Sequence, residues 1–339
     1  MLTILAAIFV FGVLVTVHEF GHFVVAKLTG MRVDEFAIGF GPKIYQQKDG
    51  DTLYSLRAIP LGGYNKIAGM DPDDPIEPNS FKSKSIPARM CVILAGATMN
   101  FILPVLLFTG IFFLQGVSVP VDKPVLGVVI EGMAAQRAGL KVGDRILEIN
   151  GKKLETWSEV VSTLRANGTK EVVIKAEDTT GTVKNYSMQP VFDKEAGRPL
   201  IGISPQFLKR NLGIFESIAE GFSYTKYIIT AMLDGLVKII TGEAPAEVAG
   251  PIGVAQMAGQ IAERGLLPLM NFVAFLSINL GVINLLPLPA LDGGHFVLLV
   301  LEALRGKPLG SKAMTNIQMV GIILILALTV FSTFKDITR

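Results

Sequence analysis

Residues Leu2–Leu28, LTILAAIFVFGVLVTVHEFGHFVVAKL, predict a membrane protein, because the segment is apolar and long enough for a helix to cross a membrane. It contains HEFGH at His18–His22, although the chain has only three histidines. Residues four apart share one helix face, so His18 and His22 can bind one Zn²⁺ while Glu19 reaches a water on that ion. A charged group at bilayer depth costs roughly 2–3 kcal/mol. The motif therefore predicts a functional metal site rather than a packed core histidine.

The composition indicates an integral membrane protein. Half of the 339 residues are hydrophobic and 18% are charged, whereas about a quarter are charged in a typical soluble protein. The net charge of +2 gives no indication of nucleic-acid binding. Cys91 is the single cysteine, so the chain has neither an internal disulfide nor a cysteine-based metal site.

The apolar blocks predict a polytopic α-helical membrane protein with about four transmembrane helices. The predicted helices cover residues 2–28, 90–114, 267–288 and 314–334. A further apolar segment, 222–240, carries Lys226, Asp234 and Lys238, and we interpret it as an amphipathic helix at the interface. No basic residue precedes the first run, so we expect it to be retained rather than cleaved as a signal peptide.

The basic residues predict how the chain is oriented. They are frequent in the loop between the first two spans and in the short loop between the last two. Positive charge in short loops favours the cytoplasm. The N-terminus and the long central loop are then expected outside, with the active site towards the cytoplasmic side.

The first loop predicts a membrane-associated β-hairpin over residues 33–68, within an N-terminal membrane part of residues 1–120. Strand-like segments at 33–41 and 52–58 flank the turn sequence KDGD at 48–51. Such a strand pair can dip to membrane depth only where protein or a water-filled cavity satisfies its backbone.

The central loop, residues 121–193, predicts a separate extracytoplasmic α+β domain. Strands are expected at 126–130, 145–149, 171–176 and 184–188, and helices at 134–138 and 157–165. The pattern AGL at 138–140, GDRI at 143–146 and ING at 149–151 resembles a PDZ domain. Residues 194–265 are then a connecting and amphipathic helical region, and residues 266–339 a C-terminal membrane part.

A second polar cluster follows the third span, where Pro287 and Pro289 should break the helix. A catalytic zinc typically has three protein ligands and one open position. Asp292 and His295 are both candidates for the third ligand, and coordination chemistry alone does not choose between them. The alternative role for His295 is to orient a ligand or to pack.

Five motifs in order, HEFGH, GFG at 39–41, PLGGY at 60–64, the PDZ-like insert and NLLPLPALDG at 284–293, resemble the site-2 protease family of intramembrane zinc metalloproteases. The chain is most similar to its bacterial RseP-like group, here with a single PDZ domain. The resemblance implies that Asp292, of the LDG motif at 291–293, is the third ligand, with His18 and His22, of one Zn²⁺ per chain. It also implies that Glu19 is the catalytic base, that Asn284 contributes to substrate handling, and that the hairpin offers an edge strand to the substrate.

The resemblance further implies hydrolysis of transmembrane segments in regulated intramembrane proteolysis, in a multi-pass protein of the bacterial cytoplasmic membrane. Single-span membrane proteins, such as anti-sigma factors or remnant signal peptides, are the expected substrates. The PDZ-like domain would either bind an exposed C-terminus or gate access by size. Two alternatives are a non-catalytic PDZ-bearing membrane adaptor and a metal transporter. Tightly retained zinc would favour the protease over transport.

Overall fold

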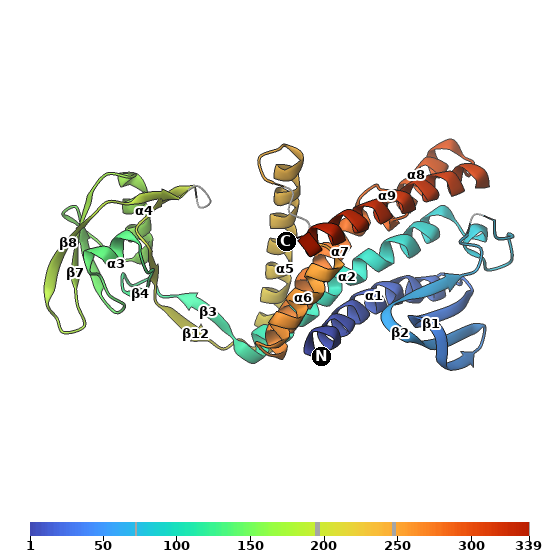
Figure 1. Ribbon diagram of the computed structural model, residues 1–339, viewed down its shortest axis with the longest axis horizontal. Helices are drawn as coiled ribbons and strands as arrows, with labels where there is room; N and C mark the ends of the chain where they lie inside the picture. The colour runs from blue at the N-terminus through green and yellow to red at the C-terminus, as the bar shows by residue number, and fades with distance from the viewer. Residues whose placement is uncertain (72, 194–196, 246–248, 339) are drawn as a thin grey trace. The chain divides into compact units, whose positions relative to one another are not determined.

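The computed structural model describes residues 1–71, 73–193, 197–245 and 249–338, and it divides the chain into two compact units (Figure 1). The first unit combines residues 1–114 and 213–339. The second unit, residues 115–212, is inserted between the two parts of the first.

Helices dominate the first unit. They are α1 (Leu2–Leu28), α2 (Ile86–Gln115), α5 (Ile214–Ile240), α6 (Pro251–Ala262), α7 (Leu266–Leu285), α8 (Asp292–Arg305) and α9 (Ser311–Thr338). Among the described residues, four helices are long and apolar enough to cross a membrane: α1, α2, α7 and α9. These are the four predicted spans, and the chain is a polytopic helical membrane protein. Helix α5 is not among the four, and it stands across their common direction in Figure 1.

The surface of α9 shows why these helices need a lipid environment. Only 11% of its most apolar window is buried within the protein. Large apolar side chains such as Ile322, Leu326 and Phe331 are exposed along it. Exposed apolar residues in such number would aggregate in water, whereas hydrocarbon accepts them.

Three apolar clusters hold the first unit together. Val10 and Leu14 of α1 pack with Ala258 of α6 and Val273 of α7. A second cluster joins α2 and α7 to α5, and a third joins α1, α2, α8 and the hairpin. Helix α2 therefore contacts the elements that come from both ends of the sequence.

The hairpin consists of β1 (Val33–Asp49) and β2 (Thr52–Ile67), followed by the short 3₁₀ helix η1 (Phe81–Ser83). Its strands are longer than predicted because they pair twice. Residues 35–38 pair on one side with 53–56 and on the other with 63–66, while 45–49 pair with 52–56. The hairpin is thus curled into a four-row sheet, and in the described pairing residues 63–66 form an outer row.

The inserted unit is built around an antiparallel sheet of order β6-β5-β7-β8. Its elements are β3 (Val117–Pro120), β4 (Leu126–Val129), α3 (Ala134–Ala138), β5 (Arg145–Ile149), β6 (Lys152–Lys153), α4 (Trp157–Asn167), β7 (Val172–Glu177), β8 (Val183–Met188), β9 (Val191–Asp193), β10 (Arg198–Leu200), β11 (Ile203–Pro205) and β12 (Phe207–Arg210). The helices and strands predicted between 126 and 188 are present. Side chains of Leu126, Ile146 and Val172 lie in one fully buried core.

The last strands of this unit were not predicted from the sequence. Strand β11 pairs with β4, and β12 pairs with β3, so residues 203–210 return to the beginning of the insert. These segments are three or four residues long, too short to show a period of their own. The compact unit accordingly extends to 212, whereas the predicted domain ended at 193.

Candidate metal centre

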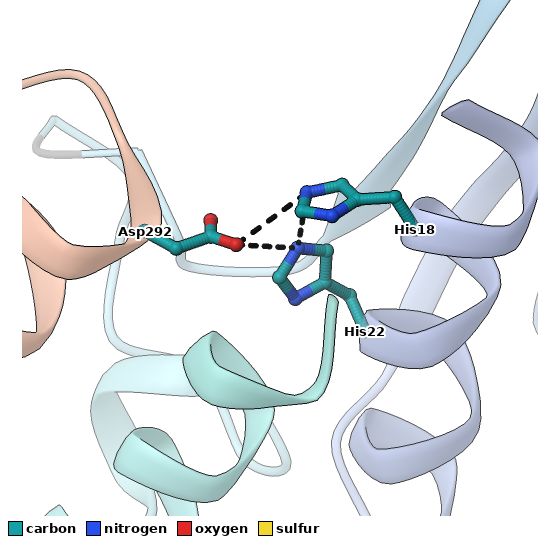
Figure 2. A group of neighbouring side chains, drawn as sticks. All are labelled: His18, His22 and Asp292. Atoms are coloured by element: carbon teal, nitrogen blue, oxygen red, sulfur yellow. Dashed lines mark hydrogen bonds and ion pairs between the residues drawn. The ribbon is translucent and has the colours of Figure 1, made fainter. Parts of the chain in front are cut away.

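Three side chains from the two ends of the sequence meet in the first unit (Figure 2). His18 and His22 extend from neighbouring turns of α1, and Asp292 faces them from the first turn of α8. The two imidazole Nε2 atoms are 3.2 Å apart. Asp292 Oδ2 lies 3.4 Å from Nε2 of His18 and 3.5 Å from Nε2 of His22. His295 is not part of this triangle.

The triangle fits a zinc ion. Ligand atoms bound to tetrahedral zinc at about 2.0–2.1 Å lie about 3.3–3.4 Å from one another, close to the three distances observed. Asp292 Oδ2 is buried and has no hydrogen-bond partner among the described residues. A buried carboxylate oxygen without a partner is costly, and a cation would satisfy it. Two imidazoles and a carboxylate are a donor set that zinc prefers.

Hydrogen bonds behind the imidazoles decide which ring nitrogens face the centre. His22 Nδ1 lies 2.7 Å from the backbone oxygen of Val92 in α2. Because a carbonyl only accepts, Nδ1 carries the proton and donates it, which leaves the Nε2 lone pair for a metal. His18 Nδ1 instead faces two amides, with Nδ2 of Asn100 at 3.1 Å and Nδ2 of Asn284 at 3.5 Å.

Glycines let α1 approach α2 closely enough for these contacts. A Cβ atom on Gly96 of α2 would overlap His22 Nε2 and lie 2.7 Å from Cε1 of both imidazoles. A Cβ atom on Gly21 of α1 would overlap the backbone oxygen of Ala95. The imidazoles therefore occupy the space that a side chain at Gly96 would fill.

The break between α7 and α8 brings Asp292 into place. Helix α7 ends at Leu285, and α8 begins at Asp292 after a segment that contains Pro287 and Pro289. Side chains at Gly293 or Gly294 would overlap backbone carbonyl oxygens of this segment, so the turn folds tightly onto the start of α8. The positive end of the helix dipole favours a carboxylate in the first turn. The predicted helix break is observed.

The remaining predicted residues lie close by. Glu19 is on α1 between the two imidazoles in sequence, and the backbone N–H of Asn65 in β2 lies beside its carboxylate. Asn284 is buried near the end of α7 and reaches His18. His295 lines a cavity of about 380 Å³ together with Arg89 and Glu302. Burial, its largest influence, lowers the pKa of His295 despite the attraction of Asp292, so the ring is neutral at pH 7.

An ion pair ties α8 to α2. Arg89 Nη2 lies 2.5 Å and Nη1 3.2 Å from the two carboxylate oxygens of Glu302. Their side chains are only 10% and 12% exposed. The pair fixes the far end of the helix whose first residue is Asp292.

A polar network links the rows of the hairpin to one another. The Glu35 carboxylate accepts hydrogen bonds from Ser55 Oγ at 2.6 Å and from Arg57 Nη2 at 2.8 Å, and Arg57 also donates to the Tyr64 hydroxyl. Burial disfavours the charged carboxylate, but these hydrogen bonds outweigh it and lower the pKa of Glu35 to about 2. The network joins three rows of the curled sheet.

Asn100 and Gly96 were missed in the sequence. Glycine is common in apolar runs such as that of α2, so Gly96 is recognised only through the imidazoles that it contacts. An amide at mid-span is nevertheless unusual in hydrocarbon. That signal alone would have singled out Asn100.

Comparison with known proteins gives one family match. The model of peptidase family M50 matches residues 6–328. The chain is 31% identical to the regulator of sigma-W protease RasP of Bacillus subtilis, over 99% of this chain and 98% of that protein. It is 33% identical to the zinc metalloprotease RasP of Geobacillus kaustophilus, with the same coverage. The PDZ domain of an SdrC-like protein of Listeria monocytogenes is 24% identical and covers 26% of this chain and 93% of that domain, with a TM-score of 0.23.

Proposed function

The chain belongs to peptidase family M50 and is an intramembrane zinc metalloprotease, and from that membership we propose which of its residues cut the substrate. The observation that carries the proposal is the triangle of His18, His22 and Asp292, with 3.2–3.5 Å between donor atoms. These three residues would hold one zinc ion per chain.

Glu19 is the catalytic base in this proposal. Zinc, when bound, supplies a Lewis acid that makes water acidic and polarises the scissile carbonyl. Glu19 takes a proton from the attacking water and later delivers it to the departing amine, because a carboxylate that has accepted a proton can donate it again. Asn284, buried beside His18, would place its amide against the carbonyl oxygen as negative charge develops there.

The substrate we propose is a single-span membrane protein. A transmembrane helix hides its carbonyls in its own hydrogen bonds, so it must unwind before hydrolysis. The outer row of the hairpin, residues 63–66, lies beside the base, since the Asn65 backbone N–H reaches Glu19. An unwound segment added as a further strand to this row would regain backbone hydrogen bonds next to Glu19.

We also propose where the protein acts. It is a multi-pass membrane protein, which we assign to the bacterial cytoplasmic membrane by its family, and the basic loops favour an orientation with the N-terminus and the insert outside. The relative in Bacillus subtilis is named a regulator of sigma-W protease. By analogy, anti-sigma factors and remnant signal peptides are substrates of the same kind, and the PDZ-like insert gates access of substrates with large external domains.

The test is cleavage by purified protein. A model transmembrane substrate is incubated in proteoliposomes with wild type and Glu19→Gln, each with and without a chelator. We expect cleavage by wild type alone, lost with the chelator, while Glu19→Gln keeps its zinc but does not cleave. Hydrolysis by Glu19→Gln would refute the assigned base. Weak, exchangeable zinc would favour the transporter alternative, and partner recruitment without any cleavage would favour the adaptor.

A further inference from the structure

We propose that Asn100 is a positioning residue that holds the His18 imidazole in its metal-binding tautomer, and that it does so by rotating its side-chain amide. This inference rests on the proposed zinc site. Asn100 is fully buried in α2, and its Nδ2 atom lies 3.1 Å from His18 Nδ1. Its Oδ1 atom is buried without a hydrogen-bond partner among the described residues.

The tautomer of His18 follows from what its Nδ1 atom contacts. A neutral imidazole carries one N–H and one lone pair. With an amide nitrogen facing Nδ1, the lone pair is on Nδ1 and the proton on Nε2, where it blocks a metal. For Nε2 to bind zinc, the proton must sit on Nδ1 and have an acceptor. The metal-free and metal-bound forms of His18 thus need opposite partners at the same place.

Asn100 can supply both partners. Rotation of its amide by about 180° exchanges nitrogen and oxygen, so the unpartnered Oδ1 atom comes to face Nδ1 and accepts its proton. His22 needs no such change, since the Val92 carbonyl already fixes its tautomer. The two imidazoles are therefore oriented differently, one by a fixed acceptor and one by an amide that can turn.

Asn100 is better placed for this role than Asn284. The Asn284 amide is farther from His18 Nδ1, at 3.5 Å. The backbone of Asn100 is also anchored, because Ser277 Oγ of α7 donates to its carbonyl oxygen at 2.8 Å. A Cβ atom on Gly281 of α7 would crowd the Phe101 ring and the Asn100 Cβ atom, so this glycine lets α7 lie close to α2 at Asn100. With Asn100 holding His18, the amide of Asn284 remains available to the substrate.

The test measures zinc affinity by chelator competition, independently of cleavage. Asn100→Leu removes the acceptor and should weaken zinc binding about 10–100-fold. Asn100→Asp should keep near wild-type affinity, because either carboxylate oxygen accepts from Nδ1. Asn284→Leu should change zinc affinity by less than about threefold while lowering kcat. Asn271→Leu is the matched control, since it removes an amide of α7 that bonds only to the Leu267 carbonyl among the described residues.

A second measurement follows the imidazole protons of the wild-type protein, with and without zinc. With three histidines in the chain, ¹⁵N-labelled imidazoles can be assigned from His→Gln variants. We expect the His18 proton on Nε2 without zinc and on Nδ1 with zinc. The same tautomer in both states would overturn the inference, even if Asn100→Leu failed to fold.

The outcomes separate this inference from the proposed function. If wild type neither retains zinc nor cleaves, the proposed function fails. If wild type does both but Asn100→Leu binds zinc as tightly as Asn271→Leu, only the role of Asn100 is refuted. Loss of affinity in Asn284→Leu instead of Asn100→Leu would likewise transfer the role to Asn284.

Discussion

Replacing Gly96 by alanine tests whether the α1–α2 contact sets the geometry of the metal centre. The new Cβ atom would lie 2.7 Å from Cε1 of both His18 and His22, whereas ordinary contacts are at least 3.4 Å. The rings must therefore withdraw by about 0.7 Å, more than the roughly 0.2 Å that ligand distances to a metal tolerate. A misplacement of about 1 Å costs on the order of 100-fold in rate. We expect weaker zinc binding and about 100-fold slower cleavage.

The matched control for this change lies in the same helix. Apart from the adjoining backbone of α2 itself, no atom of the described residues lies within 4 Å of a Cβ atom built on Gly110. Gly110→Ala should leave zinc affinity and cleavage unchanged. Alanine is about 1 kcal/mol more favourable than glycine in a helix, so neither variant should lose helix content. Zinc affinity by chelator competition and single-turnover cleavage are the assays. If Gly96→Ala behaves like Gly110→Ala in both, the close contact does not position the imidazoles.

Three further predictions concern the elements around the centre. Arg89→Met leaves Glu302 buried and unpaired and should lower the free energy of unfolding by about 3–5 kcal/mol, measured by thermal unfolding in detergent. Adding Glu302→Leu should restore most of this stability. An equal loss of stability in the double variant would contradict the ion-pair account. The hairpin network is stabilised by ionised Glu35, whose pKa falls from its ordinary 4.5 to about 2. Protection of the hairpin amides from hydrogen exchange should therefore be full above about pH 4.5 and decline towards pH 2. A similar decline in Glu35→Gln would refute this cause. Replacing residues 115–212 by a short Gly-Ser linker should admit substrates with large external domains, whereas lost cleavage of every substrate would indicate a binding role for the insert.

The features predicted most accurately are those that a regular residue pattern within one continuous segment determines. The spans were visible because apolar runs near 20 residues have few alternatives to a membrane helix. The pair His18 and His22 was visible because a helix alone brings them together. The proposed third ligand was different, since Asp292 and His295 are equally plausible by residue type. In the structure, α8 begins at Asp292 and directs that carboxylate to the imidazoles, while His295 lines a separate cavity.

Contacts between segments that are distant in the chain could not be predicted from the sequence. The acceptor for His22 is a backbone carbonyl, which every residue carries, so no residue type could mark Val92. The hairpin was predicted from its turn, but the second pairing of 35–38 with 63–66 depends on how β2 curls back. The same holds for β11 and β12, which are short and become strands only by pairing with β4 and β3.

The pairing of β3 with β12 has a consequence for how the membrane bundle assembles. Helices α2 and α5 pack together, although roughly 100 residues separate them in the chain. In that ladder Val117 lies opposite Arg210, so a folded insert reduces the connection to the length of a tight loop. Closing a loop of a few residues instead of 100 saves about 2–3 kcal/mol of chain entropy. Substitutions that unfold the insert should therefore also slow the packing of α2 against α5, although the substituted residues lie outside both helices.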